Sequence, residues 1–416
     1  MRQLPELLIP ASSLEVLKVA SVFGADAVYI GGEAFGLRAK AKNFSMEEMA
    51  EGIRFAHEHG VKVYVTANVL AHNDDIEDAA DYFKELKAIG PDALIISDSG
   101  MFMTAKEVCP EIDIHISTQA NNVNYKTFLF WHQQGASRVV TGRELSLEEI
   151  RQIRAQIPDS LEIETFVHGA MCISYSGRCL LSNYFTGRDA NRGACTHPCR
   201  WKYAVVEETR PGEYMPVYEN ERGTFIFNSK DLCMIEHLPD LIEAGIDSLK
   251  IEGRMKTALY VATVARTYRK ALDDYAAGED KYQANMPWYL DQISNCTYRQ
   301  FTTGFFYGKP GQDAQIYDSN TYIKEYTYLG IVNEIRDDGF CKIEQRNKFS
   351  AGETIEIMKP DGRNIETTVE EIWGEQKGNA GPVWELQKSA PHSKQALWVK
   401  LDKCPRKMDI LRRQGA

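Results

Sequence analysis

The sequence predicts an α/β protein: a (β/α)8 barrel of the TIM type, with a cysteine-rich insertion after strand seven and a C-terminal all-β domain that resembles a small β-barrel. Three observations lead to this fold class. Short segments rich in β-branched residues alternate with amphipathic helical stretches through the first 276 residues. Four cysteines interrupt this alternation after its seventh strand, and an eighth strand and helix follow them. Beyond about residue 287, short alternating strands replace the pattern.

Repeated βα units of this length indicate a parallel sheet covered by helices, and eight of them fit a closed barrel better than an open, doubly wound sheet. In the helical stretch Ser45–His59, Ser45 is a candidate N-cap and acidic residues occupy the first turn. Asp231–Ala244 is expected to supply the helix before the last strand, and Met255 to about Ala276 the helix after it. The expected strands are Leu7–Pro10, Ala27–Gly31, Lys62–Thr66, Ala93–Ser97, Asp113–Ser117, Arg138–Thr141, Ile163–His168 and Ser248–Glu252.

The insertion, at about residues 172–227, is expected at the C-terminal mouth of the barrel, where such folds carry their chemistry. Polar residues at the ends of the other strands should face the same mouth. They are Tyr29, Asn68, Asp98, Ser117, Thr118, Gln119, Arg143, His168, Glu252 and Arg254.

In the C-terminal part of the chain, apolar and polar residues alternate as in short strands, and turns are expected at Asp337–Gly339 and Pro360–Gly362. This pattern predicts an antiparallel sheet or small barrel of roughly six strands. We therefore expect a catalytic domain at residues 1–286 and a β-barrel-like domain at residues 287–416.

The composition is that of an ordinary soluble globular protein, with 44% hydrophobic and 26% charged residues among 416. The N-terminus has no apolar core of the length of a signal peptide, and no run of about 20 apolar residues occurs. We expect a cytoplasmic protein without a membrane partner. A net charge of −11 argues against a surface generally coated with basic residues, but it allows a local basic patch.

Cys172, Cys179, Cys195 and Cys199 are separated by six, fifteen and three residues in a glycine-rich stretch. In a reducing compartment, clustered cysteines are more often metal ligands or catalysts than disulfides. Four thiolates suit an iron–sulfur cluster or zinc, and the spacing alone leaves zinc open. Cys233 is a fifth candidate ligand, although we interpret it as a core position on a helix that starts near Asp231.

Arg254, Lys250 and Arg143 are candidate anion-binding residues, because they follow or end expected strands at the mouth and a guanidinium binds a carboxylate through two hydrogen bonds. The alternative for Arg254 is an internal ion pair with Glu252. Arg178 belongs to a group of basic residues interleaved with the cysteines, which could bind phosphates or compensate anionic thiolates.

Glu164 and His168 flank the strand that enters the cysteine stretch, and either is a candidate general base. A histidine at this position could also be a hydrogen-bonded support. The GxSxG signature of serine hydrolases and the HExxH signature of zinc peptidases are both absent.

The segment ETFVHGAMCISYSGRCLLS, at residues 164–182, resembles the signature of the collagenase-like peptidase family U-32. The matching positions include Glu164, Phe166, Gly169, Cys172 and Cys179. The segments GRDANRGACTHPCRW, NSKDL and SLKIEGRMK resemble the branch of this family that hydroxylates RNA. The resemblance runs from the first strand to the tail.

The resemblance implies a [4Fe–4S] cluster on Cys172, Cys179, Cys195 and Cys199, with Cys233 as a possible substitute for Cys199. It also implies hydroxylation of the wobble uridine of tRNA to 5-hydroxyuridine without dioxygen, with prephenate, a dicarboxylate, as hydroxyl donor. The partner is then the tRNA anticodon loop, which the C-terminal domain is expected to contact. Two alternatives stay open: a collagenase-like peptidase, and a zinc-stapled RNA-binding scaffold without catalysis.

Overall fold

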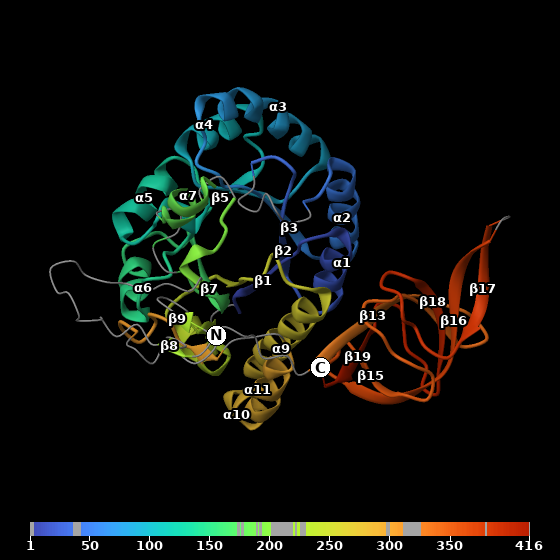
Figure 1. The fold of residues 1–416 in the computed structure, drawn as a ribbon. Coiled ribbons are helices and arrows are strands. Elements are labelled where there is room, and N and C mark those ends of the chain that lie inside the picture. The colour runs from blue at the N-terminus through green and yellow to red at the C-terminus, as the bar shows by residue number, and fades with distance from the viewer. Residues whose placement is uncertain are drawn as a thin grey trace.

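The computed structural model describes residues 4–35, 43–172, 175, 179–188, 190, 194–200, 219–220, 223–224, 230–296, 300–310, 326–378 and 381–415. Its N-terminal half is a closed barrel of eight parallel strands (Figure 1), as predicted. Pairing of β11 with both β7 and β1 completes the ring. The strands are β1 (Glu6–Pro10), β2 (Ala27–Gly31), β3 (Lys62–Ala67), β4 (Ala93–Ile96), β5 (Asp113–Ile116), β6 (Arg138–Val140), β7 (Glu162–Ala170) and β11 (Ser248–Ile251).

Helices surround this barrel on its outside (Figure 1). Ser45, the predicted cap, forms a capping box with Glu48. Thr257 caps the long helix after β11, which begins at Ala258 and not at Met255 as expected. The main apolar core lies between strands and helices, while a smaller cluster that includes Leu8, Tyr29 and Tyr64 fills the barrel interior. The outer helices are α1 (Leu14–Val22), α2 (Met46–Glu58), α3 (Asn73–Ile89), α4 (Ser99–Val108), α5 (Tyr125–Gln133), α6 (Leu147–Arg154), α8 (Leu238–Glu243) and α9 (Ala258–Ala277).

The segment between β7 and β11 differs from expectation at its end. Asp231–Cys233 was predicted to begin a helix, but it forms a short strand, β10, that runs antiparallel to β7 and parallel to β12 (Phe301–Thr302). The helix α8 starts only at Leu238, where Pro239 favours a first turn. Cys233 is therefore a buried strand residue and not a helical one. The described parts of the insertion also contain α7 (Leu181–Thr186) and the pair β8 (Glu219–Asn220) and β9 (Gly223–Thr224).

Two helices follow α9 and still belong to the barrel. They are α10 (Glu279–Ala284) and α11 (Met286–Ser294), and Tyr289 of α11 is fully buried and donates to Asp274 Oδ2 at 2.6 Å. The expected boundary at residue 287 thus falls inside a helix of the barrel layer. Pro287 lies in the first turn of this helix, where proline needs no hydrogen-bond partner, so it does not mark a change of domain.

The C-terminal part is an antiparallel sheet that closes on itself, as predicted. Six strands form the ring and the long β16–β17 hairpin projects from it (Figure 1). The last strand, β19 (Ile410–Gln414), pairs with both β13 and β15 and is needed for closure. The strands are β13 (Tyr326–Ile335), β14 (Phe340–Glu344), β15 (Thr354–Met358), β16 (Asn364–Gly378), β17 (Gly381–Gln387), β18 (Ala396–Leu401) and β19 (Ile410–Gln414).

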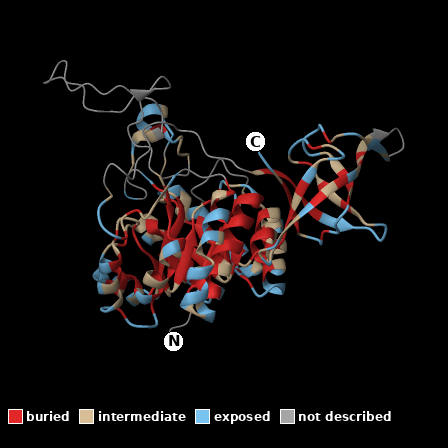
Figure 2. Cartoon of the chain, turned by 90° about the horizontal axis from the view of Figure 1, so that it is seen from below, coloured by how far each residue is buried: buried red, intermediate tan, exposed pale blue. Residues whose placement is uncertain are grey.

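The β-sheet part docks against the barrel near α9. Arg266 of α9 is 1% exposed and donates to the Lys359 carbonyl at 3.0 Å and to Asn364 Oδ1 at 2.8 Å. Arg346 forms an ion pair with Glu15 of α1 at 2.7 Å. Figure 2 shows burial concentrated in the barrel strands and in the inner faces of its helices. Within the described residues, every helix is too short or too polar to traverse a lipid bilayer.

Candidate active site at the barrel mouth

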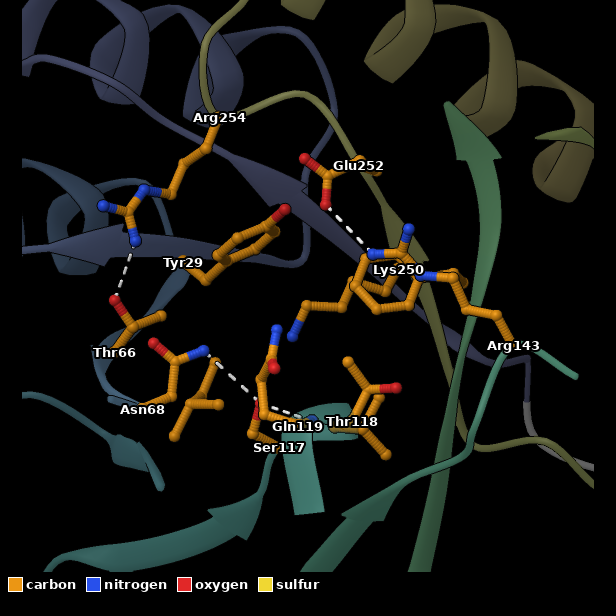
Figure 3. A pocket seen from close by; sticks show the side chains of 13 residues that line it. Tyr29, Thr66, Asn68, Ser117, Thr118, Gln119, Arg143, Lys250, Glu252 and Arg254 are labelled. Carbon is orange, nitrogen blue, oxygen red and sulfur yellow. Dashed lines mark hydrogen bonds and ion pairs between the residues drawn. The ribbon is translucent and has the colours of Figure 1, made fainter. Parts of the chain in front are cut away.

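A cavity of about 60 Å³ opens at the C-terminal ends of the barrel strands. Side chains from seven of the eight barrel strands, or from the turns after them, line it. Figure 3 shows the labelled ones converging on the cavity. Eight of the ten polar residues predicted to face the mouth line this cavity, so strand ends alone located most of it. The lining residues are Tyr29, Thr66, Asn68, Ile95, Ser117, Thr118, Gln119, Val140, Arg143, Phe166, Lys250, Glu252 and Arg254.

Arg254 lies three residues beyond the end of β11 and is 5% exposed. Its guanidinium donates to Thr66 Oγ1 at 2.9 Å (Figure 3). It also donates to Asn43 Oδ1 at 3.3 Å. A Cβ atom on Gly31 would lie 2.5 Å from Arg254 Nη2, so only glycine at the end of β2 leaves room for the guanidinium. The cation is thereby fixed in one orientation at one side of the cavity.

Arg143 holds the opposite side of the cavity. Its Nη2 donates to Glu252 Oε2 at 3.2 Å, its Nη1 donates to the Ala170 carbonyl at 2.9 Å, and its guanidinium lies over the Phe166 ring. The ion pair that we considered between Arg254 and Glu252 is therefore made by Arg143 in this structure. Because Ala170 ends β7, Arg143 also ties the cavity to the start of the cysteine stretch.

A buried charge network forms the floor of the cavity. Lys250 Nζ lies 2.6 Å from Glu164 Oε1, and Arg138 contacts Glu164 at 3.1 Å and Glu6 at 2.6 Å. Burial opposes the charge of Arg138, but the carboxylates of Glu6 and Glu164 outweigh it and raise the Arg138 pKa. Glu164 is 0% exposed and does not line the cavity. It therefore supports Lys250, and Glu164 itself makes no contact with a bound molecule.

His168 also lies outside the cavity. The pairing of β7 with β11 shifts register at this point, and the His168 ring packs between Tyr260, Tyr268 and Phe301. Its Nδ1 is 3.4 Å from the Tyr268 hydroxyl, and burial lowers the His168 pKa to about 4. The side chain is therefore neutral near pH 7 and supports the packing of β7 against α9. The other predicted mouth residue that is absent from the lining, Asp98, caps α4 by accepting from the Gly100 N–H at 2.8 Å.

The four candidate ligand cysteines lie beyond the end of β7. Cys172 is exposed, the other three are half-buried, and none forms a disulfide. Ser182 of α7 accepts the Thr196 N–H at 3.1 Å and so joins two parts of this segment. Among the described residues, no group of three or more His, Cys, Asp or Glu side chains is arranged to hold a metal ion. The donor chemistry suits a thiolate-ligated centre, but the described positions do not bring three donors together.

Arg178 lies outside the described residues, so its expected role in phosphate binding has no structural counterpart here. Sequence reasoning missed Thr66 and Phe166, which line the cavity, and Gly31, which makes room for Arg254. Thr66 ends the third expected strand, and its position alone could have identified it. Nothing local to Gly31 or Phe166 indicates their contacts with arginines from other βα units.

Two family descriptions match the chain. Residues 12–316 match "Peptidase family U32", and residues 324–412 match "Peptidase family U32 C-terminal domain". The chain belongs to peptidase family U32. Both matched segments agree with the division of the described structure into a barrel and a β-sheet part.

Two of the similar curated proteins match over nearly the full length of this chain. "tRNA hydroxylation protein P1" of Bacillus subtilis is 43% identical over 96% of this chain and 92% of its own length. "tRNA hydroxylation protein P" of Escherichia coli is 40% identical over 95% of this chain and 93% of its own length. A "23S rRNA 5-hydroxycytidine synthase" of Escherichia coli is 40% identical over 64% of this chain and 39% of its own length.

Proposed function

We propose that this protein is an RNA-modifying hydroxylase that acts on tRNA. The observation that carries the proposal is the near full-length similarity to two tRNA hydroxylation proteins of family U32, at 43% and 40% identity. A cavity at the C-terminal mouth of a closed barrel supports it, because this is where such barrels carry their chemistry. The product is 5-hydroxyuridine at the wobble position, and the tRNA substrate implies a cytoplasmic location.

The hydroxyl donor in this proposal is a small dicarboxylate, prephenate. Arg254, Lys250 and Arg143 place three cations around one cavity, and an arginine fork complements a carboxylate. Hydroxylation replaces the C5–H bond of uridine by C5–OH and removes two electrons from the base. The exchange balances without dioxygen if the donor's C–OH bond becomes C–H, so that the donor gains those two electrons.

Cys172, Cys179, Cys195 and Cys199 are proposed to hold a [4Fe–4S] cluster, with zinc as the alternative metal. The support is the chemistry of four thiols, none of them in a disulfide, next to the strand that ends at Ala170. Such a cluster would supply electron transfer or Lewis acidity beside the mouth. We derive no step through it, since the described thiols do not converge.

The substrate base is proposed to leave its stack and enter the cavity from the anticodon loop. Exposed aromatic side chains on α7 support this, because unstacked bases pack on aromatic rings. Tyr184 is 81% exposed and packs edge-on against Phe185.

A peptidase function, which the family name suggests, has little support at this site. Among the described residues, those that line the cavity include no histidine, cysteine or aspartate. Thr118 Oγ1 donates to the Thr141 carbonyl, and Ser117 Oγ accepts from Asn68 and Gln119, so neither described hydroxyl is paired with a side chain that acts as a base in nucleophilic catalysis. Iron, sulfide and zinc contents of anaerobically purified protein separate the cluster from a zinc-stapled scaffold.

The function is tested by nucleoside analysis of tRNA from a deletion strain that lacks other routes to 5-hydroxyuridine. We expect the modification to disappear in the deletion and to return with the wild-type gene. Arg254→Ala and Gly31→Ala should each reduce it at least about tenfold, because the first removes the guanidinium and the second displaces it.

Arg151→Lys, on the outer surface of α6, is the matched control and should restore full modification. Unchanged 5-hydroxyuridine in the deletion strain would exclude the proposed function. Full activity of Arg254→Ala would instead remove only the anion-binding role.

A further inference from the structure

We propose that Asn68 selects the base, by accepting a hydrogen bond from N3–H of a uracil bound in the barrel cavity. This inference rests on the proposed function and adds to it the residue that distinguishes uridine from cytidine. Asn68 follows β3 directly and lines the cavity with Ser117 and Gln119 on the side below Tyr29 in Figure 3.

The side chain of Asn68 is held in place but not satisfied. Its backbone carbonyl accepts from Ser97 Oγ at 3.0 Å, and its Nδ2 is 3.4 Å from Ser117 Oγ. Its Oδ1 is buried and has no hydrogen-bond partner among the described residues. Buried acceptors are nearly always paired in folded proteins, so an unpaired one at a cavity wall indicates a donor that arrives with a ligand.

The expected donor follows from the difference between uridine, the proposed substrate, and cytidine, the nucleoside that the name of one relative specifies. Uracil carries a hydrogen on N3 between two carbonyl oxygens, whereas N3 of cytosine is an acceptor. An amide oxygen at this place therefore accepts from uracil and opposes cytosine, which leaves two acceptors facing each other. Gln119, whose own N–H donates to Ser117 Oγ at 3.3 Å, brings a second amide to the same wall for a uracil carbonyl.

The charge distribution in the cavity assigns this wall to the base and not to the dicarboxylate. Arg254 and Arg143 contact other lining residues, Thr66 and Glu252, and Lys250 contacts Glu164 in the floor beneath the lining. A carboxylate placed at Asn68 would face its oxygen, so the anion is stabilised on the cationic side. With N3 at the amide wall, the C5–C6 edge of the base is turned away from that wall and toward the rest of the cavity.

The test is the binding of anticodon stem–loop RNA that differs only at the target nucleotide, measured by fluorescence anisotropy with wild-type protein. The probes carry uridine, 3-methyluridine or cytidine there. 3-Methyluridine keeps both carbonyls and carries a methyl group on N3 in place of the hydrogen. We expect the uridine probe to bind at least about fivefold more tightly than either other probe, since a well-placed polar contact to a base edge is worth that discrimination or more.

Asn68→Leu should bind the three probes within about twofold of one another, whereas Asn68→Asp, which keeps an acceptor oxygen, should retain preference for uridine over 3-methyluridine. Equal binding of uridine and 3-methyluridine probes by the wild type overturns the inference even if no variant folds. Unchanged discrimination by a folded Asn68→Leu protein also overturns it. In either case 5-hydroxyuridine formation by the wild type continues, whereas failure of the proposed function appears as unchanged modification in the deletion strain.

Discussion

Glu164, in the floor of the cavity, has a structural role and does not contact a bound molecule. Glu164 bonds both Lys250 and Arg138, so this carboxylate keeps two buried cations compensated beneath the lining residues. Breaking a buried ion pair leaves an unpaired charge and costs about 3–5 kcal/mol. The placement of Glu164 therefore explains its occurrence in the motif without a direct part in proton transfer.

At the same scale, His168 predicts a pH dependence of stability. Burial lowers the folded-state pKa to about 4, below the ordinary value of roughly 6.5. As pH falls below about 6.5, His168 is therefore protonated in the unfolded chain but stays neutral in the folded protein. The free energy of unfolding falls by about 3 kcal/mol between pH 6.5 and pH 4, and His168 has no such effect above pH 6.5.

Urea unfolding at pH 7, 5.5 and 4.5 measures this effect in the wild type and in His168→Gln. The variant is expected to be less stable at pH 7 and to lose less stability on acidification. The same pH dependence in both proteins would show that His168 is protonated equally well in the folded state.

At the scale of elements, the junction of β7 and β11 is the most constrained part of the mouth. Gly169 has φ +106°, and a Cβ atom there would lie 2.4 Å from the Glu252 carbonyl oxygen. Gly169→Ala must force the two strands apart, so we expect a loss of about 3 kcal/mol or more in unfolding free energy, together with loss of tRNA modification.

Gly60→Ala is the matched control for this change. Gly60 also has a positive φ, of +71°, but a Cβ atom there meets nothing within 4 Å. It should therefore cost only about 1 kcal/mol, the strain of the left-handed backbone alone. Thermal unfolding measures the stability of both variants. An equal loss of unfolding free energy in Gly169→Ala and Gly60→Ala would contradict the packing argument.

The elements also show what sequence reasoning reaches. Alternation of β-branched and amphipathic segments located all eight barrel strands, because each strand is buried on both faces and its helix begins with a local cap. β10 was not predicted because Asp231–Cys233 is too short to show a period, and its partner strands, β7 and β12, are distant in sequence. The orientation of His168 was not predicted because it depends on a register shift and not on strict alternation.

The candidate site was also predictable in part. Lining residues at strand ends were predictable from position, since the ends of parallel strands meet at one edge. The pairing of Arg143 with Glu252, and the room that Gly31 gives to Arg254, depend on contacts between distant βα units. Positions of thiols in an irregular insertion carry no period from which their spatial arrangement could be derived.

At the scale of the whole molecule, α9 connects the barrel to the C-terminal sheet. The guanidinium of Arg266 lies in the interface and donates hydrogen bonds to the Lys359 carbonyl and to Asn364 Oδ1. Arg266→Met should therefore lower the unfolding free energy by about 3 kcal/mol, because buried acceptors lose a charged donor. It should also loosen the docking, which small-angle X-ray scattering measures as a larger radius of gyration.

Arg363→Met is the control, since this exposed side chain pairs with Asp361 two residues away. It should leave both quantities unchanged. Wild-type dimensions and stability in Arg266→Met would mean that the apolar contacts of Tyr328, Met358 and Ile410 with the barrel core suffice for docking.

The pairing of β1 with β11 joins Glu6 to Ser248, so β1 acquires one of its neighbours only after 242 further residues have been synthesised. At about 5–20 residues per second, the nascent chain carries that uncovered edge for on the order of ten to fifty seconds. Open strand edges recruit other chains during such intervals. The yield of intact protein in a cell therefore depends on how this edge is sheltered during synthesis, before any of the finished packing exists.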